Sequence, residues 1–167
     1  CAAPVADEVF TAGDDDEDAL NRFAEGIDVA TLEFENVPAS ACAVVERHVP
    51  LRPNATILTV AQNRRREKTY LSQHGFPCVP FEVAEDEASL GEAADRLGFP
   101  CVAKTAAFGY DGKGQILLKS AGEHVGVFER LGQPDAVVVE AWIEHSGEFS
   151  IVVARRPDGT IATFPIA

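Results

Sequence analysis

A short glycine-rich segment between two apolar runs constrains this chain more than any other feature. Residues 109–115 read Gly-Tyr-Asp-Gly-Lys-Gly-Gln, and residues 100–104 and 115–118 on either side have the composition of short strands. Glycines let backbone N–H groups approach an anion closely. Lys113 in the loop and Lys104 at the end of the preceding strand could then neutralise the charge of a phosphate. A flexible hairpin is the alternative, because Asp-Gly is a common turn. The segment lacks the Gly-Lys-Ser/Thr sequence of a Walker A loop.

The first 49 residues alternate between strand and helix patterns. Residues 9–11 and 27–32 are apolar runs of strand length, and the acidic run at residues 14–18 suits a helix N-terminus. A second helix is predicted to carry Val44, Val45 and His48 on one side. A β-α-β-α order is typical of a parallel sheet.

The rest of the chain divides into a helical connector and a region of mixed strands and helices. Pro53 is predicted to open one connector helix, while Asn63 caps a second that Gly75 closes. Beyond residue 76, helices are predicted at residues 86–97 and after the capping box of Ser120 and Glu123. Strands are predicted at residues 79–83, 100–104, 115–118, 136–140, 148–155 and 161–166, the last two joined by a Pro-Asp-Gly turn.

Composition and charge exclude several classes of protein. The 167 residues carry a net charge of −13 without a basic face, which argues against a nucleic-acid binder. No apolar run approaches the length of about 20 residues that spans a bilayer, so no membrane association is expected. The four cysteines form no Cys-x-x-Cys pair and no secretory signal is evident, so reduced thiols and no structural metal site are expected. The chain contains no Met, and we expect it to be an internal fragment of a longer protein.

Two further features are candidates for nucleotide binding. The apolar strand at residues 137–139 ends at Glu140, where main-chain groups could meet an adenine edge, and Glu148 could accept hydrogen bonds from ribose hydroxyls. A core strand followed by solvated glutamates is the alternative. Arg64 begins a basic run, residues 64–66, which taken alone would be the exposed face of a helix.

Together, in this order along the chain, these features resemble the ATP-grasp superfamily. The Gly-Tyr-Asp-Gly-Lys-Gly-Gln heptad closely resembles the N5-carboxyaminoimidazole ribonucleotide synthase family, the ATPase subunit of phosphoribosylaminoimidazole carboxylase in purine biosynthesis. Residues 33–37 (Glu-Phe-Glu-Asn-Val) and 64–68 are also similar to that family. One departure is Asn63, where the family usually has Asp; both cap helices well.

The resemblance implies a carbon–nitrogen ligase. Such an enzyme carboxylates 5-aminoimidazole ribonucleotide with bicarbonate and ATP, through carboxyphosphate, and releases ADP and phosphate. Lysines, arginine and backbone amides suit this chemistry, because phosphoryl transfer depends mainly on positioning and charge neutralisation. The implied ATP-binding residues hold phosphate, adenine and ribose in turn: Arg64, Lys104, Gly109, Tyr110, Asp111, Gly112, Lys113, Gly114 and Gln115; then Glu140, Ala141, Trp142 and Ile143; then Glu148.

The resemblance also predicts the organisation of the chain. We expect residues 1–52 to be the end of a Rossmann-like pre-ATP-grasp domain (α/β), residues 53–76 a helical connector, and residues 77–167 the first part of an ATP-grasp domain with its lid (α+β). Magnesium ligands are expected beyond Ala167, so the fragment itself should be inactive. A cytoplasmic homodimer with only small-molecule substrates is implied. Another ATP-grasp ligase, or a non-catalytic nucleotide-binding module, is the alternative.

Overall fold

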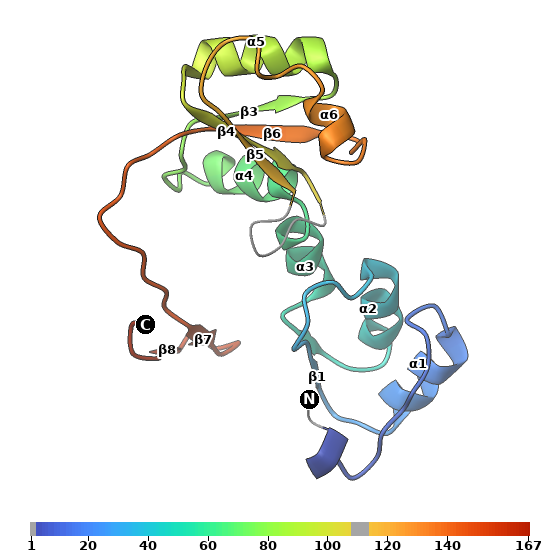
Figure 1. The fold of residues 1–167 in the computed structure, drawn as a ribbon. Coiled ribbons are helices and arrows are strands. Elements are labelled where there is room, and N and C mark those ends of the chain that lie inside the picture. The colour runs from blue at the N-terminus through green and yellow to red at the C-terminus, as the bar shows by residue number, and fades with distance from the viewer. Residues whose placement is uncertain (1–2, 108–113) are drawn as a thin grey trace.

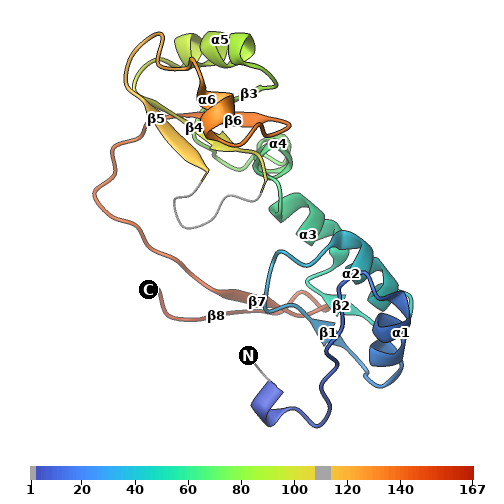
Figure 2. The ribbon, with the colours of Figure 1, turned by 45° about the vertical axis from the view of Figure 1, so that its right-hand side comes forward.

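The computed structural model describes residues 3–107 and 114–167, which form two lobes linked by a helix (Figure 1). The N-terminal lobe comprises residues 3–52. The sheet lobe comprises residues 64–141, and an extended C-terminal segment leaves it toward a small hairpin (Figures 1 and 2). No helix among the described residues is long and apolar enough to cross a membrane.

The N-terminal lobe is built on one parallel β-α-β unit. Strand β1 (Ala30–Thr31) pairs in parallel with β2 (Leu51–Arg52), and α2 (Ala39–Glu46) connects them. Helix α1 (Glu17–Glu25) begins where the Asp16 side chain accepts a hydrogen bond from Ala19 N at 2.9 Å, as the acidic run predicted. The apolar faces of these elements form a small core of Ala24, Ala30, Cys42, Val45 and Leu51, to which the helix that follows β2 adds Leu58. The α/β character expected for this part of the chain is confirmed.

The strand predicted at residues 9–11 is wrong. These residues follow a short 3-10 helix (Ala3–Val5) as irregular chain, and the Phe10 ring packs edge-on against Phe23 with centroids 5.9 Å apart. The second strand of the sheet is instead Leu51–Arg52, a two-residue element that is too short to show any periodicity. His48 was also misplaced, because it lies beyond the end of α2 and is exposed, with Nε2 2.9 Å from Asn21 Oδ1.

One helix links the lobes, and the next helix opens the sheet lobe. Helix α3 (Ala55–Ala61) begins at Asn54, whose side chain accepts from Ile57 N, so Pro53 precedes the helix rather than opening it. Helix α4 (Arg64–Gln73) begins at Asn63, whose side chain accepts from Arg66 N, as predicted. Gly75 closes α4 by donating its N–H to Ser72 O at 3.1 Å.

The sheet lobe is a four-stranded antiparallel sheet in the order β3-β6-β4-β5. Its strands are β3 (Phe81–Ala84), β4 (Cys101–Thr105), β5 (Gln115–Leu118) and β6 (Val137–Ala141). Helix α5 (Glu87–Leu97) covers one face and α4 lies against the other (Figures 1 and 2). This two-sided cover explains why β6 is apolar at successive residues: Val137 and Val139 face the α5 side, while Val138 belongs to the cluster on the α4 side. A fully buried valine contributes roughly 1.5–3 kcal/mol.

The helix predicted after Ser120 is mostly wrong. Ser120 and Glu123 do interact, with Oγ 2.7 Å from Oε1, but residues 121–126 form turns and helix α6 spans only Val127–Arg130. Gly122 and Gly126 have φ angles of 86° and 75°, and this left-handed backbone interrupts a helix. The pair therefore stabilises a turn rather than a helix N-terminus.

The C-terminal hairpin was predicted correctly in kind. Strands β7 (Val153–Arg155) and β8 (Ile161–Thr163) are antiparallel, and residues 156–160 make the turn between them. Both strands are shorter than the predicted runs. Residues 142–152 form no helix or strand and run as an extended trace from β6 to the hairpin (Figure 1).

Candidate functional site

The α4-facing side of the sheet carries two of the predicted site residues. In the sheet register Lys104 pairs with Val138 and Glu140 pairs with Val102. Alternation along each strand therefore places Lys104, Val138 and Glu140 on one face. Val138 belongs to the apolar cluster that faces α4, so both charged side chains emerge beneath that helix.

Glu140 lies between two lysines. Its Oε2 accepts a hydrogen bond from Lys104 Nζ at 2.8 Å, and its Oε1 lies 3.1 Å from Lys68 Nζ. The exposed fractions of these side chains are 10% for Glu140, 15% for Lys68 and 24% for Lys104. The Lys68 ammonium also lies over the Phe81 ring, 5.6 Å from its centroid. We refer to Lys68, Glu140 and Lys104 as the lysine–glutamate cluster.

Two opposing effects act on the pKa of Glu140. Burial raises it, while the hydrogen bonds and charges of Lys104 and Lys68 lower it, and the lysines prevail. The carboxyl group is therefore ionised at neutral pH. Two ammonium groups against one carboxylate leave the cluster with one positive charge, which favours an anionic ligand.

Arg64 lies where α4 begins and β4 ends. Its N–H donates to Ala106 O at 2.7 Å and its Nη1 donates to Thr105 O at 3.1 Å, while Asn63 forms an isolated β-bridge with Ala107. The start of α4 is thereby fixed against the residues that follow Lys104 in the chain. The structure thus brings Arg64 and Lys104, which are 40 positions apart, to the same end of β4.

The glycine-rich loop is only partly described. Gly109, Tyr110, Asp111, Gly112 and Lys113 lie outside the described residues. Gly114 accepts a hydrogen bond from Thr105 N at 2.8 Å, and Gln115 begins β5 directly opposite Lys104. The last two residues of the heptad therefore lie beside Lys104.

The segment predicted to meet adenine leaves the sheet at the edge of the cluster. Ala141 N donates to Pro80 O at 3.0 Å and Trp142 N donates to Pro100 O at 3.2 Å, so both N–H groups are already used in hydrogen bonds within the protein. Among the described residues no backbone hydrogen bond uses the Ile143 N–H. The Trp142 and Ile143 side chains are about half exposed.

Among the predicted site residues that the structure describes, Glu148 lies apart from the lysine–glutamate cluster. Its side chain is 85% exposed, and its Oε1 lies 3.1 Å from His145 Nε2. It belongs to the extended segment that departs from the sheet lobe (Figure 1). The contacts of the described residues do not join it to the lysine–glutamate cluster.

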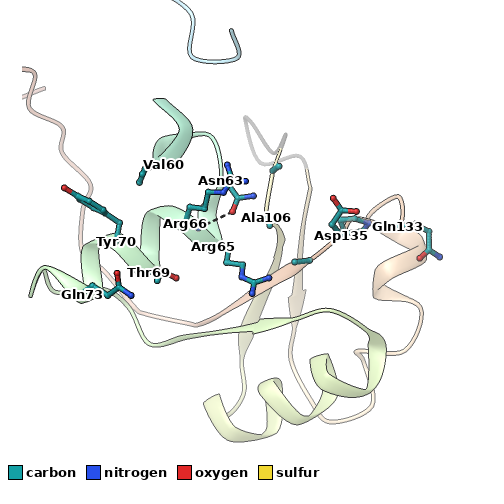
Figure 3. A pocket seen from close by; sticks show the side chains of 13 residues that line it. Val60, Asn63, Arg65, Arg66, Thr69, Tyr70, Gln73, Ala106, Gln133 and Asp135 are labelled. Atoms are coloured by element: carbon teal, nitrogen blue, oxygen red, sulfur yellow. Dashed lines mark hydrogen bonds between the residues drawn. The ribbon is translucent and has the colours of Figure 1, made fainter. Parts of the chain in front are cut away.

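Sequence reasoning missed Lys68. The signal that could have found it is its spacing from Arg64, because residues four apart in a helix share a face. The remaining arginines of the basic run, Arg65 and Arg66, line a groove of about 850 Å³ (Figure 3). The Nη1 atom of Arg65 lies 2.8 Å from Oε1 of Glu85. None of the predicted site residues that the structure describes lines this groove.

Family models match both parts of the chain. A model described as the ribonucleotide synthetase preATP-grasp domain matches residues 1–62, and one described as the ATP-grasp domain matches residues 69–167. The second match covers more than half of the chain and includes the whole lysine–glutamate cluster except Lys68.

Individual proteins are similar over nearly the entire chain. The N5-carboxyaminoimidazole ribonucleotide synthase of Pseudomonas aeruginosa is 36% identical over 166 residues, 99% of this chain and 46% of that protein. The crystal structure of an ADP complex of N5-carboxyaminoimidazole ribonucleotide synthetase is 34% identical with a TM-score of 0.88, covering 98% of this chain and 43% of the other. The crystal structure of N5-carboxyaminoimidazole synthetase from Staphylococcus aureus complexed with ADP is 31% identical with a TM-score of 0.88, and it covers 98% of this chain and 43% of the other. This chain thus spans less than half the length of these relatives.

The ATP-grasp family expected from the order of the motifs and the fold expected from the order of elements are both confirmed by these matches. The chain belongs to the ATP-grasp family.

Proposed function

We propose that the intact protein is an N5-carboxyaminoimidazole ribonucleotide synthase. It would use ATP and bicarbonate to carboxylate 5-aminoimidazole ribonucleotide, releasing ADP and phosphate. The observation that carries the proposal is the positively charged lysine–glutamate cluster, held beside Arg64 and the end of the glycine-rich heptad. The similarity of the chain to synthases of that name supports it.

The described residues fit a nucleoside triphosphate. We propose that Lys104, Arg64 and the heptad, residues 109–115, bind its phosphates, because a cluster with net positive charge and backbone N–H groups suits phosphate oxygens. Main-chain groups of residues 140–143 would bind adenine, with the Ile143 N–H as the donor that the fold leaves available.

Glu148 requires a separate argument, because its side chain is 85% exposed within the extended segment. We propose that it accepts hydrogen bonds from the ribose hydroxyls when nucleotide binds. Magnesium would accompany ATP and neutralise its phosphate charge. We assign it no ligand within this chain.

Nucleotide titration and turnover test the proposal together. In the intact protein, we expect phosphate release that requires both bicarbonate and 5-aminoimidazole ribonucleotide. Replacing Lys104 by Met removes one charged hydrogen bond, so ATP affinity should fall about tenfold to a hundredfold. Lys119→Met is the matched control, since Lys119 is an exposed lysine just beyond β5.

Three results would count against the proposal. An equal loss of ATP affinity in Lys104→Met and Lys119→Met would show that Lys104 does not bind phosphate. ATP binding without turnover on 5-aminoimidazole ribonucleotide would indicate another ATP-grasp ligase or a non-catalytic module. No ATP binding at all would exclude a nucleotide site.

We also propose that the intact protein is a cytoplasmic homodimer. The three cysteines within the described residues, Cys42, Cys78 and Cys101, are unpaired, which supports a reducing compartment. Light scattering on the purified protein would give its mass in solution, and a monomer would contradict the dimer.

A further inference from the structure

Two lysines share one carboxylate in the lysine–glutamate cluster, although one would suffice to neutralise it. Lys68 binds Oε1 and Lys104 binds Oε2, so each ammonium has its own oxygen. Either lysine can therefore leave without disturbing the bond of the other.

The two lysines are not equivalent in their surroundings. Lys68 is the more buried, and the Phe81 ring beneath its ammonium gives it a second attraction. Lys104 is more exposed and lies opposite Gln115, at the end of the heptad. Of the two, Lys104 is the one placed to reach an incoming anion.

A transfer of the Lys104 ammonium to an anion has a consequence for Glu140. This carboxylate is only 10% exposed, and a buried charge without a partner is strongly unfavourable. If Lys104 were its only partner, each binding event would leave Glu140 unpaired, and that cost would be subtracted from the affinity. With Lys68 in place, Glu140 keeps one ammonium throughout.

We propose that Lys68 is a positioning residue that retains the Glu140 carboxylate, so that Lys104 is free to transfer its ammonium to a phosphate group. The inference rests on the proposed function for the identity of that anion. Lys68 itself touches no phosphate in this scheme. It acts through Glu140, and its effect depends on Glu140 carrying a charge.

A double-mutant cycle separates this role from direct binding. Calorimetric titrations of the intact protein would measure the binding of ATP, adenosine and inorganic tripolyphosphate. The proteins compared are the wild type, Lys68→Met, Glu140→Gln, the double variant Lys68→Met with Glu140→Gln, and Lys68→Arg. Lys68→Met should lower the affinity for ATP and for tripolyphosphate about tenfold or more, which is the equivalent of one charged hydrogen bond. The affinity for adenosine should stay within about twofold of the wild-type value. Lys68→Arg keeps the charge and should stay near the wild type.

The double variant decides the matter. It restores the single positive charge of the cluster and removes the carboxylate that needed a partner, so most of the lost phosphate affinity should return. If the double variant binds ATP as weakly as Lys68→Met, Lys68 contacts phosphate directly and the inference is wrong. A parallel loss for adenosine would show a merely structural role and would also overturn it. Tripolyphosphate allows the role of Lys68 and the proposed function to be tested separately. A wild-type protein that binds tripolyphosphate but not ATP would contradict the proposed function. The variants titrated with tripolyphosphate would still test the role of Lys68.

Discussion

Glu140→Gln should lower the free energy of unfolding of the sheet lobe at neutral pH. In acid the variant and the wild type should be equally stable. Glutamine has nearly the same shape, so the substitution removes charge with little change in packing. The carboxylate holds two ammonium groups at 2.8 and 3.1 Å and is 10% exposed. Removing a buried charged partner costs several kcal/mol, but both lysines are long enough to reach water, so we expect a loss of about 2–3 kcal/mol at pH 7.

The pH dependence follows from the direction of the pKa shift. The pKa of Glu140 is lower in the folded protein than its ordinary value of 4.5. Its contribution is therefore fully present above pH 4.5 and is lost as the pH falls through the folded-state pKa. The difference between wild type and variant should close in the same range, because the wild-type carboxyl group becomes neutral.

Urea unfolding followed by far-ultraviolet circular dichroism at pH 7, 5 and 3.5 would measure these differences. Glu82→Gln is the matched control, since Glu82 is a glutamate in the same sheet whose partner, Arg96, is 56% exposed. An exposed ion pair of this kind contributes little to stability, because solvent screens it. A Glu140→Gln loss that is the same at every pH would mean lost packing rather than lost charge, and a loss equal to that of Glu82→Gln would refute the reasoning.

Three other substitutions test separate features. A Cβ on Gly91 of α5 would lie 2.8 Å from His124 Nε2, so Gly91→Ala should destabilise the wild-type protein by about 1 kcal/mol or more. In a His124→Ala background the same substitution should stabilise the protein by about 1 kcal/mol, because alanine favours a helix more than glycine does. Urea unfolding of the four proteins would measure these effects, and equal effects in both backgrounds would contradict the clash. Thr105 Oγ1 is buried without a hydrogen-bond partner among the described residues, so Thr105→Val should leave stability unchanged or raise it by about 1 kcal/mol, and a clear fall in the melting temperature would reveal a partner. Glu148→Gln should weaken ATP but not 2′,3′-dideoxy-ATP in calorimetric titrations, and a wild type that does not distinguish the two nucleotides would assign Glu148 no part in ribose binding.

Many helices and strands could be predicted from residues close together in the sequence. Asp16, Asn63 and Asp86 each accept the hydrogen bond of a helix cap, and a cap depends on residues only three positions away. The apolar run of β6 and the turn before β8 are equally local signals. Where such signals were absent or conflicting, prediction failed: β2 is two residues long, and Gly122 and Gly126 outweighed the pair formed by Ser120 and Glu123.

The sequence by itself determined the family, the fold class and the order of the basic and glycine-rich motifs, because these are properties of residues near one another in the chain. Only the tertiary structure decided which charges meet. Lys68 lies 36 positions before Lys104, and Lys104 lies 36 positions before Glu140, so nothing local relates them. They converge because the sheet register sets Lys104 and Glu140 on one face and the packing of α4 places Lys68 above them. A side chain that looks like an exposed helical lysine in the sequence becomes a partner of a buried carboxylate, since the energy of an ion pair depends on distance and solvent exposure and not on separation in sequence.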